Sequence, residues 1–376
     1  MVVAVHAAFV GRWSGPDDGL LRFQREFSTG VLLFFVVSGF VISLPWLRAL
    51  LEDRPLPAVA PYVVRRGGRL LPAYWLSIVG AVALVGPAAV TDWKAILTHV
   101  FMVHDLVPHE AYTVGSPYWT LGVEVQFYAV VPILGGAIRR FHKSSITPRT
   151  LLRWLLIGWA SSVAWTLVAT ELGPALVLAL HGGNQAVNAE RVSDLLLLAL
   201  PSKFMLFCPG IAIAVLAADP RRTSLPLSQL SGMILAPLLI AGWILVAMMS
   251  ALPPSAVHAV GHDLLMSLVF GGALLLGLRA QRPGRRVIGL LAGIGTVSYG
   301  IYVWHWIASI RLGGVGLIRP ASPLMAVLQW LVVTAILLVV SLVLAATSWV
   351  FLERRCIAAT HGWGRARYVV RWRRAV

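Results

Sequence analysis

Residues 30–51 decide the fold class, and they read Gly-Val-Leu-Leu-Phe-Phe-Val-Val-Ser-Gly-Phe-Val-Ile-Ser-Leu-Pro-Trp-Leu-Arg-Ala-Leu-Leu. A transmembrane helix needs about 20 mostly apolar residues to cross the hydrocarbon core of a bilayer. This stretch has that length, and its one charged side chain, Arg48, lies near its end. It is therefore predicted to span a membrane.

Similar apolar stretches recur along the whole chain. Further spans are predicted near 71–90, 118–138, 151–170, 194–217, 233–252, 263–280, 288–310 and 323–352. A tenth apolar run, Met1–Val10, is too short to cross alone, and no charged residue precedes it. We therefore expect the first helix to lack its beginning in this sequence. The predicted fold is all-α, a polytopic membrane bundle of about ten transmembrane helices.

The composition agrees with a membrane protein and gives no sign of a separate soluble module. Hydrophobic residues make up 58% of the 376 residues and charged residues only 12%, against roughly 25% charged residues in a soluble domain. We expect a single membrane domain over 1–376, with residues 353–376 as a basic cytoplasmic tail. The two cysteines, Cys208 and Cys356, lie in separate segments, so neither a disulfide framework nor a metal site is predicted.

The positive charge predicts the orientation. A formal net charge of +16 would suggest a nucleic-acid partner in a soluble protein. Here we interpret the cations as topology signals, because Lys and Arg concentrate in cytoplasmic loops, and we expect no nucleic acid as a partner. With Met1–Val10 as the first span, the loops that follow even-numbered spans and the tail hold most of the 31 cations. Both termini are therefore expected in the cytoplasm.

Among the ionisable side chains inside predicted spans, three stand out: His6, Glu124 and His305. Such groups are costly in a membrane, so each is a functional candidate. At 100° per residue, Glu124 shares a helix face with Thr120, Phe127 and Tyr128, and His305 shares one with Ser298 and Tyr302. These polar stripes are expected to face the interior of the bundle. An alternative is that they only bond helices together.

A basic cluster, Arg65, Arg66 and Arg69, is placed by these spans in a cytoplasmic loop before residue 71. Guanidinium groups bind phosphates well, so the cluster could hold a phosphorylated cofactor that arrives from the cytosol. It could also be a plain topology signal, and the two roles are compatible.

Five motifs in this order resemble those of the acyltransferase 3 family, the bacterial integral membrane O-acyltransferases that modify surface polysaccharides, lipid-linked glycans and some secreted small molecules. The motifs cover almost the whole chain. They are Val5-His6-Ala7; Leu33-Phe34-Phe35-Val36-Val37-Ser38-Gly39-Phe40-Val41-Ile42; Arg66-x-x-Arg69-x-x-Pro72-x-Tyr74; Trp119-Thr120-Leu121-x-Val123-Glu124-x-Gln126-Phe127-Tyr128; and Ser298-Tyr299-x-x-Tyr302-x-x-His305.

This resemblance implies transfer of an acyl group, most often acetyl, from acyl-coenzyme A (acyl-CoA) on the cytoplasmic side to a hydroxyl, commonly of a sugar. By resemblance His6 is the essential first-helix histidine, and Arg66 and Arg69 are the paired arginines that contact the CoA phosphates, with Arg65 beside them. The arginine usual before that histidine has no counterpart here. The residues expected around the substrate are Ser38, Tyr118, Trp119, Thr120, Tyr128, Ser298, Tyr299, Tyr302 and His305.

The residue types suit this chemistry. A hydroxyl is a poor nucleophile at neutral pH, and a histidine can take its proton as it attacks a thioester. We hypothesise that His6 is this base and that Glu124 orients its imidazole or the acceptor hydroxyl. In a variant of this mechanism His6 carries the acyl group transiently.

Other functions fit the sequence less well. A flippase or transporter for a lipid-linked glycan would also use buried polar stripes, but no internal repeat is evident. A non-catalytic scaffold gives no reason for His6, Glu124 and the arginines to occur together. Membrane-bound O-acyltransferases of another class pair a buried histidine with an asparagine. The only asparagines in this sequence, Asn184 and Asn188, lie in one polar loop, so that resemblance fails. The histidines without metal-ligand spacing are interpreted as ordinary polar loop residues: His99, His104 and His109.

Overall fold

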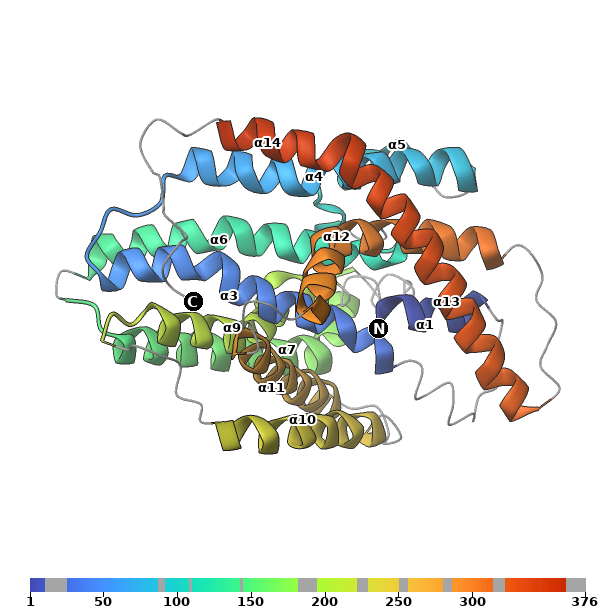
Figure 1. Cartoon of the computed structure of the whole chain (residues 1–376). Coiled ribbons are helices and arrows are strands. Elements are labelled where there is room, and N and C mark those ends of the chain that lie inside the picture. Colours follow the sequence, from blue (N-terminus) through green and yellow to red (C-terminus); the bar gives the residue numbers. More distant parts are fainter. Residues whose placement is uncertain are drawn as a thin grey trace.

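The computed structural model confirms the all-α fold (Figure 1). It describes residues 1–10, 26–86, 92–107, 110–142, 145–181, 195–221, 229–249, 256–279, 286–313 and 322–362, and these ranges contain helices and turns but no strand. The long helices are α3 (Gly30–Leu51), α4 (Val59–Val85), α6 (Trp119–Phe141), α7 (Pro148–His181), α9 (Leu200–Ala218), α10 (Gln229–Met249), α11 (Ala256–Arg279), α12 (Arg286–Gly313) and α13 (Pro323–Ser348).

Shorter elements complete the described chain. They are α1 (Val2–Val10), η1 (Glu26–Thr29), α5 (Trp93–Val100), η3 (His104–Leu106), η4 (Ser116–Tyr118), the π-helical turn η5 (Trp349–Glu353) and α14 (Arg354–Gly362). Seven helical segments in the described ranges are long and apolar enough to cross a membrane. These seven correspond to all or most of α3, α4, α6, α7, α9, α11 and α13, and a shorter apolar helical stretch, Leu235–Val246, lies in α10.

The prediction was wrong for the start of α4. The apolar criterion placed this span at 71–90, but the helix begins at Val59 and ends at Val85. A hydropathy window excludes turns that carry arginines, although a helix can hold cationic heads on one polar face while their aliphatic stems pack. The basic cluster therefore lies on the early turns of a helix, and not in a loop.

Helix α3 is central to one half of the bundle, where it packs against α6, α9 and α11. Its backbone meets that of α9 at two glycines, because a Cβ built on Gly39 would lie 2.3 Å from the carbonyl oxygen of Phe207. A Cβ on Gly210 would lie 1.8 Å from the carbonyl oxygen of Val36. Small residues permit such close helix crossings in membranes, and here they bring the backbones of α3 and α9 into contact.

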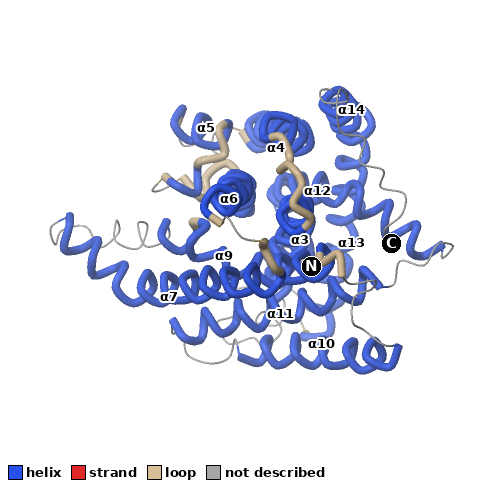
Figure 2. The backbone as a smooth tube through the Cα atoms, turned by 90° about the vertical axis from the view of Figure 1, so that its left-hand side faces the viewer, coloured by secondary structure: helices blue, strands red, loops and turns tan. Residues whose placement is uncertain are grey.

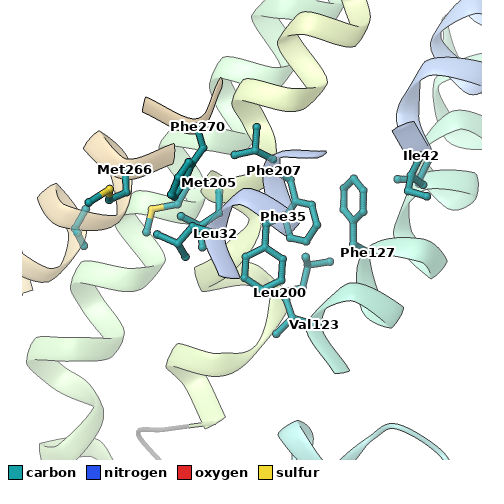
Figure 3. Close-up of a cluster of buried hydrophobic side chains, with 14 of the residues drawn as sticks. Leu32, Phe35, Ile42, Val123, Phe127, Leu200, Met205, Phe207, Met266 and Phe270 are labelled. Atoms are coloured by element: carbon teal, nitrogen blue, oxygen red, sulfur yellow. The ribbon is translucent and has the colours of Figure 1, made fainter. Parts of the chain in front are cut away.

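Aromatic side chains fill the space around this crossing (Figure 3). The rings of Phe127 and Phe207 stack with centroids 4.0 Å apart, and Phe35 packs on Phe207 at 4.9 Å. All three side chains are almost fully buried. The cluster therefore holds α3, α6 and α9 in register, which places the polar residues of α3 and α6 next to each other.

Helix α12 is central to the other half, where it packs against α1, α4 and α13. The indole of Trp330 in α13 donates a 2.7 Å hydrogen bond to the carbonyl of Ala4 in α1. The Tyr299 hydroxyl in α12 donates a 2.7 Å bond to the carbonyl of Leu70 in α4. Helix α14 then lies along the early turns of α4 (Figures 1 and 2), so the expected basic tail begins as a helix, and residues 363–376 lie outside the described residues.

Candidate active site

Glu124 joins α6 to α3 through hydroxyl groups. Its Oε1 atom accepts a 2.7 Å hydrogen bond from the Ser38 hydroxyl and a 2.5 Å bond from the Tyr128 hydroxyl. Glu124 and Tyr128 lie one turn apart on the predicted face of α6, and Ser38 comes from α3. A carboxylate with two hydroxyl donors keeps acceptor capacity on its second oxygen, which a further donor can use.

Arg66 is connected to this carboxylate through Tyr128. Its guanidinium carbon lies 5.7 Å from the ring centre of Tyr128 and 5.9 Å from that of Tyr62. The Tyr62 hydroxyl also donates a 3.1 Å bond to the backbone carbonyl of Tyr128. These cation–π contacts hold the cation beside the polar site, so Tyr128 contacts both a predicted phosphate-binding residue and a predicted catalytic residue.

Tyr62 was not predicted as a site residue. It lies one turn before Arg66, at the i, i+4 spacing that places two side chains on one helix face. The sequence shows this spacing, but it predicts a shared helix face only if residue 62 is already taken to be helical, and the predicted span began at 71.

The other two arginines of α4 are exposed. Arg69 interacts electrostatically with Glu353, whose side chain is 2% exposed and accepts a 2.9 Å bond from the Ser348 hydroxyl. Arg65 precedes Arg66 on the same helix. The three arginines therefore form one basic helical surface beside η5 and α14, with Arg66 nearest to the polar interior.

His6 and His305 meet across the bundle although 299 positions separate them. Nε2 of His305 lies 3.1 Å from Nδ1 of His6, and the ring centres are 4.8 Å apart. Trp306 meets the His6 ring edge-on at 5.1 Å. His305 is fully buried and His6 is partly buried. The structure thus gives the first-helix histidine a second histidine as a ring partner.

Tyr302 lies between the histidines and Glu124. Its hydroxyl lies 2.6 Å from the Thr120 hydroxyl and donates a 2.5 Å bond to the carbonyl of Pro117. Its ring is 5.6 Å from that of His305, and it interacts electrostatically with Glu124. Thr120 and Tyr302 were both predicted pocket residues, and the structure brings them into contact. Polar groups therefore extend from Arg66 through Glu124 to His6.

The remaining predicted pocket residues mainly join helices. The Tyr118 hydroxyl donates to the Ser77 hydroxyl at 3.0 Å, and Tyr299 binds α4 as described above. Trp119 packs against Phe35, with ring centres 6.4 Å apart. The Ser298 hydroxyl donates to the carbonyl of Gly295 in its own helix.

The interpretation of His99 and His104 as ordinary loop residues was wrong, and His109 lies outside the described residues. Both side chains are fully buried, and their rings stack with centres 4.0 Å apart. Burial lowers the pKa of His99 to about 4; burial, and then the neighbouring His99, lower the pKa of His104 to about 3. Both histidines are therefore neutral at physiological pH.

Asp105, next to His104 in η3, connects this short helix to α6. Its Oδ2 accepts a 2.5 Å bond from the Gln126 amide, and its Oδ1 would lie only 2.3 Å from a Cβ built on Gly122. Burial raises the pKa of Asp105 to about 7, although the bond from Gln126 lowers it. Asp105 and Gln126 were not predicted to pair, because they are 21 positions apart in different helices and no local spacing links them.

Asp105 is expected to make the stability of the protein depend on pH. Since its folded pKa lies above its ordinary value of 3.8, folding favours the protonated form, and stability falls as pH rises from about 4 to about 7. Asp105→Asn stays neutral and should unfold at a higher temperature than the wild type at pH 8, with a much smaller difference at pH 5. The gain is a few kcal/mol at most, at ~1.4 kcal/mol per pKa unit. Thermal unfolding of the purified protein at both pH values measures it, and an equal effect at both would contradict the burial argument.

The helices and their buried polar groups define a multi-pass integral membrane protein with a polar site inside its bundle. The family profile described as an acyltransferase domain matches residues 1–346. The chain therefore belongs to the acyltransferase 3 family, as the sequence motifs predicted.

Two curated relatives match parts of the chain. A stretch of 109 residues is 33% identical to the exopolysaccharide production protein ExoZ of Rhizobium meliloti (strain 1021), and covers 27% of this chain and 32% of that protein. A stretch of 151 residues is 28% identical to nodulation protein 10 of Rhizobium leguminosarum bv. viciae, and covers 34% of this chain and 39% of that protein. The matches thus span about a third of these relatives' length. No solved structure matches the chain.

Proposed function

We propose that this protein is an acyl-CoA-dependent O-acyltransferase. It moves an acyl group, acetyl in the first instance, to a hydroxyl of a cell-surface or lipid-linked glycan or of a secreted small molecule. The observation that carries the proposal is the contact of Tyr128 with both Arg66 and Glu124, because it joins a phosphate-binding cation to an interior polar site. The similarity to ExoZ, an exopolysaccharide production protein, supports a sugar-containing acceptor.

The basic surface of α4 binds the phosphates of the donor in this proposal. Arg65, Arg66 and Arg69 face the cytoplasm, where acyl-CoA is available, and both termini lie on the same side of the bacterial cytoplasmic membrane. Guanidinium groups form charge-assisted, often bidentate bonds to phosphate oxygens. Arg66 is held by two aromatic rings, so its charge is already positioned when the donor arrives.

The reaction itself uses the interior side chains. The oxygen of the acceptor hydroxyl attacks the thioester carbon as His6 takes the hydroxyl proton. The carbon–sulfur bond then breaks, the electron pair leaves with sulfur, and the imidazolium of His6 returns the proton to the thiolate. Glu124 stabilises the transient positive charge or orients the acceptor hydroxyl, and Ser38 and Tyr128 hold its carboxylate in place.

Removal of the paired arginines is expected to weaken donor binding more than turnover. The double variant Arg66→Ala/Arg69→Ala should raise the KM for acetyl-CoA by about 100-fold, because each charge-assisted hydrogen bond contributes ~1.5–3 kcal/mol. The kcat should change much less. Steady-state kinetics of purified protein measure both constants, and Arg140→Ala, which removes an exposed arginine near the end of α6, serves as the control. An unchanged KM in the double variant would remove the phosphate-binding role.

The proposal is tested by incubating purified protein in lipid nanodiscs with isotope-labelled acetyl-CoA and a glycan acceptor. Labelled O-acetyl product, detected by mass spectrometry together with free CoA, is the expected result. A flippase, the alternative function, would move a lipid-linked glycan and consume no acetyl-CoA. Screening acyl-CoA donors of increasing chain length in the same assay also determines the acyl group.

A further inference from the structure

His6 and His305, at the interior end of the site, form a pair in which one ring donates a hydrogen bond to the other. His6 comes from α1 and His305 from α12, and the ring contact is a 3.1 Å approach of His305 Nε2 to His6 Nδ1. Each ring is also fixed by a backbone carbonyl of its own helix. His6 Nδ1 lies 2.9 Å from the carbonyl oxygen of Val2, and His305 Nδ1 lies 2.5 Å from that of Tyr302.

These carbonyls determine where the protons lie. A carbonyl oxygen only accepts hydrogen bonds, so the nitrogen that bonds to it must carry a proton. Both Nδ1 atoms are therefore N–H donors. In a neutral imidazole the other nitrogen has no proton, which makes Nε2 of His305 an acceptor. The Nδ1–H of His6 is then shared between the Val2 carbonyl and His305, and Nε2 of His6 is the basic nitrogen of that ring.

We propose that His305 is a positioning residue for acyl transfer, which together with the Val2 carbonyl holds His6 in the Nδ1–H tautomer and stabilises its imidazolium. This inference rests on the proposed function. In the reaction, Nε2 of His6 takes the proton of the acceptor hydroxyl, and Nδ1–H then points toward the lone pair of His305 Nε2. The bond strengthens as positive charge develops on His6, and the proton returns from Nε2 to the leaving thiolate.

The surroundings of His305 fit this role. The side chain is fully buried, and a buried group is favoured when it is neutral and hydrogen-bonded. Its Nδ1 bond to Tyr302 prevents the ring from turning over, so Nε2 stays directed at His6. Trp306 packs against the His6 ring with their planes 81° apart and limits its rotation as well. A neutral histidine thus occupies the place that a carboxylate holds in a Ser-His-Asp triad.

Kinetics of three variants in α12 test the proposal. His305→Phe keeps the ring but removes the acceptor, so kcat should fall by about 100-fold, with the KM for acetyl-CoA within about 2-fold of the wild type. His305→Gln can present an amide oxygen near the Nε2 position and should recover at least a tenth of wild-type kcat. Ser309→Ala, one turn further along α12, is the control and should resemble the wild type. Wild-type kcat in His305→Phe overturns the proposal, and so does a folded His305→Gln that is no more active than His305→Phe.

Solid-state NMR of protein with ¹³C,¹⁵N-labelled histidine gives a readout that does not need activity. At pH 8 the His6 signals, assigned by their loss in His6→Asn, should show a protonated Nδ1 and an unprotonated Nε2. His305→Phe should shift the Nδ1 signal, because that proton then bonds to the Val2 carbonyl alone. A protonated Nε2 on His6 in the wild type overturns the proposal. If His305→Phe does not fold, the proposal is tested by the tautomer of His6 in the wild type and by the kcat of His305→Gln. A wild type without acyl-transfer activity but with the expected tautomer contradicts only the proposed function.

Discussion

Replacing His6 with alanine is expected to reduce acyl transfer by about 1,000-fold or more. The imidazole is the proposed base, and general-base catalysis by a positioned side chain contributes about 10²–10⁴-fold. The loss should appear in kcat, because the proposed role of His6 is in the chemical step and that of the arginines is in binding the donor phosphates. Turnover of labelled acetyl-CoA by purified variant and wild type measures the effect.

The control for this variant is His142→Ala. His142 follows the end of α6, where its ring packs edge-on against Trp154, so its loss tests the general cost of removing a histidine. Both variants should reach the membrane in amounts similar to the wild type, since α1 is held to α13 through the backbone carbonyl of Ala4. Undiminished turnover by His6→Ala would exclude His6 as base and as acyl carrier.

The change Glu124→Gln is expected to lower kcat by about 100-fold while the fold is kept. A glutamine oxygen can still accept the hydrogen bonds from Ser38 and Tyr128, but it has no negative charge to stabilise an imidazolium. This variant separates the two interpretations of the polar stripe on α6. If Glu124 only bonds helices together, the amide should replace it with little loss of activity.

A matched substitution, Glu171→Gln, removes the charge of an exposed carboxylate on α7. It should have wild-type kinetics. Thermal unfolding of Glu124→Gln should show a midpoint near that of the wild type, so that lost activity reflects the missing charge. A fully active Glu124→Gln enzyme would mean that this carboxylate has no part in the chemistry.

The sequence was sufficient to predict most helices because crossing a membrane requires a length and polarity that are visible locally. The stretch 30–51 became α3 with the same bounds, and α13 begins at the predicted residue 323. The wrong start predicted for α4 has the same cause, because the prediction used local apolarity. Its first turns carry Arg65, Arg66 and Arg69, so a criterion of apolarity excluded turns that are helical.

The site could be predicted only in part, because motifs name residues but give no contacts between distant helices. The face that joins Thr120, Glu124 and Tyr128 follows from helical periodicity. The pairing of His6 with His305 does not, because it depends on how α1 packs against α12. The burial of His99 likewise depends on how the segment between α4 and α6 folds back onto α6.

Affinity labelling with bromoacetyl-CoA tests most directly whether a donor held by α4 delivers its acyl group to His6. The reagent carries an alkylating carbon next to the position of the transferred acyl carbon. Peptide mapping by mass spectrometry should find the imidazole of His6 alkylated, with labelling suppressed by excess CoA and reduced in the double variant of Arg66 and Arg69. CoA-protected labelling at other residues, with His6 unmodified, would contradict the account.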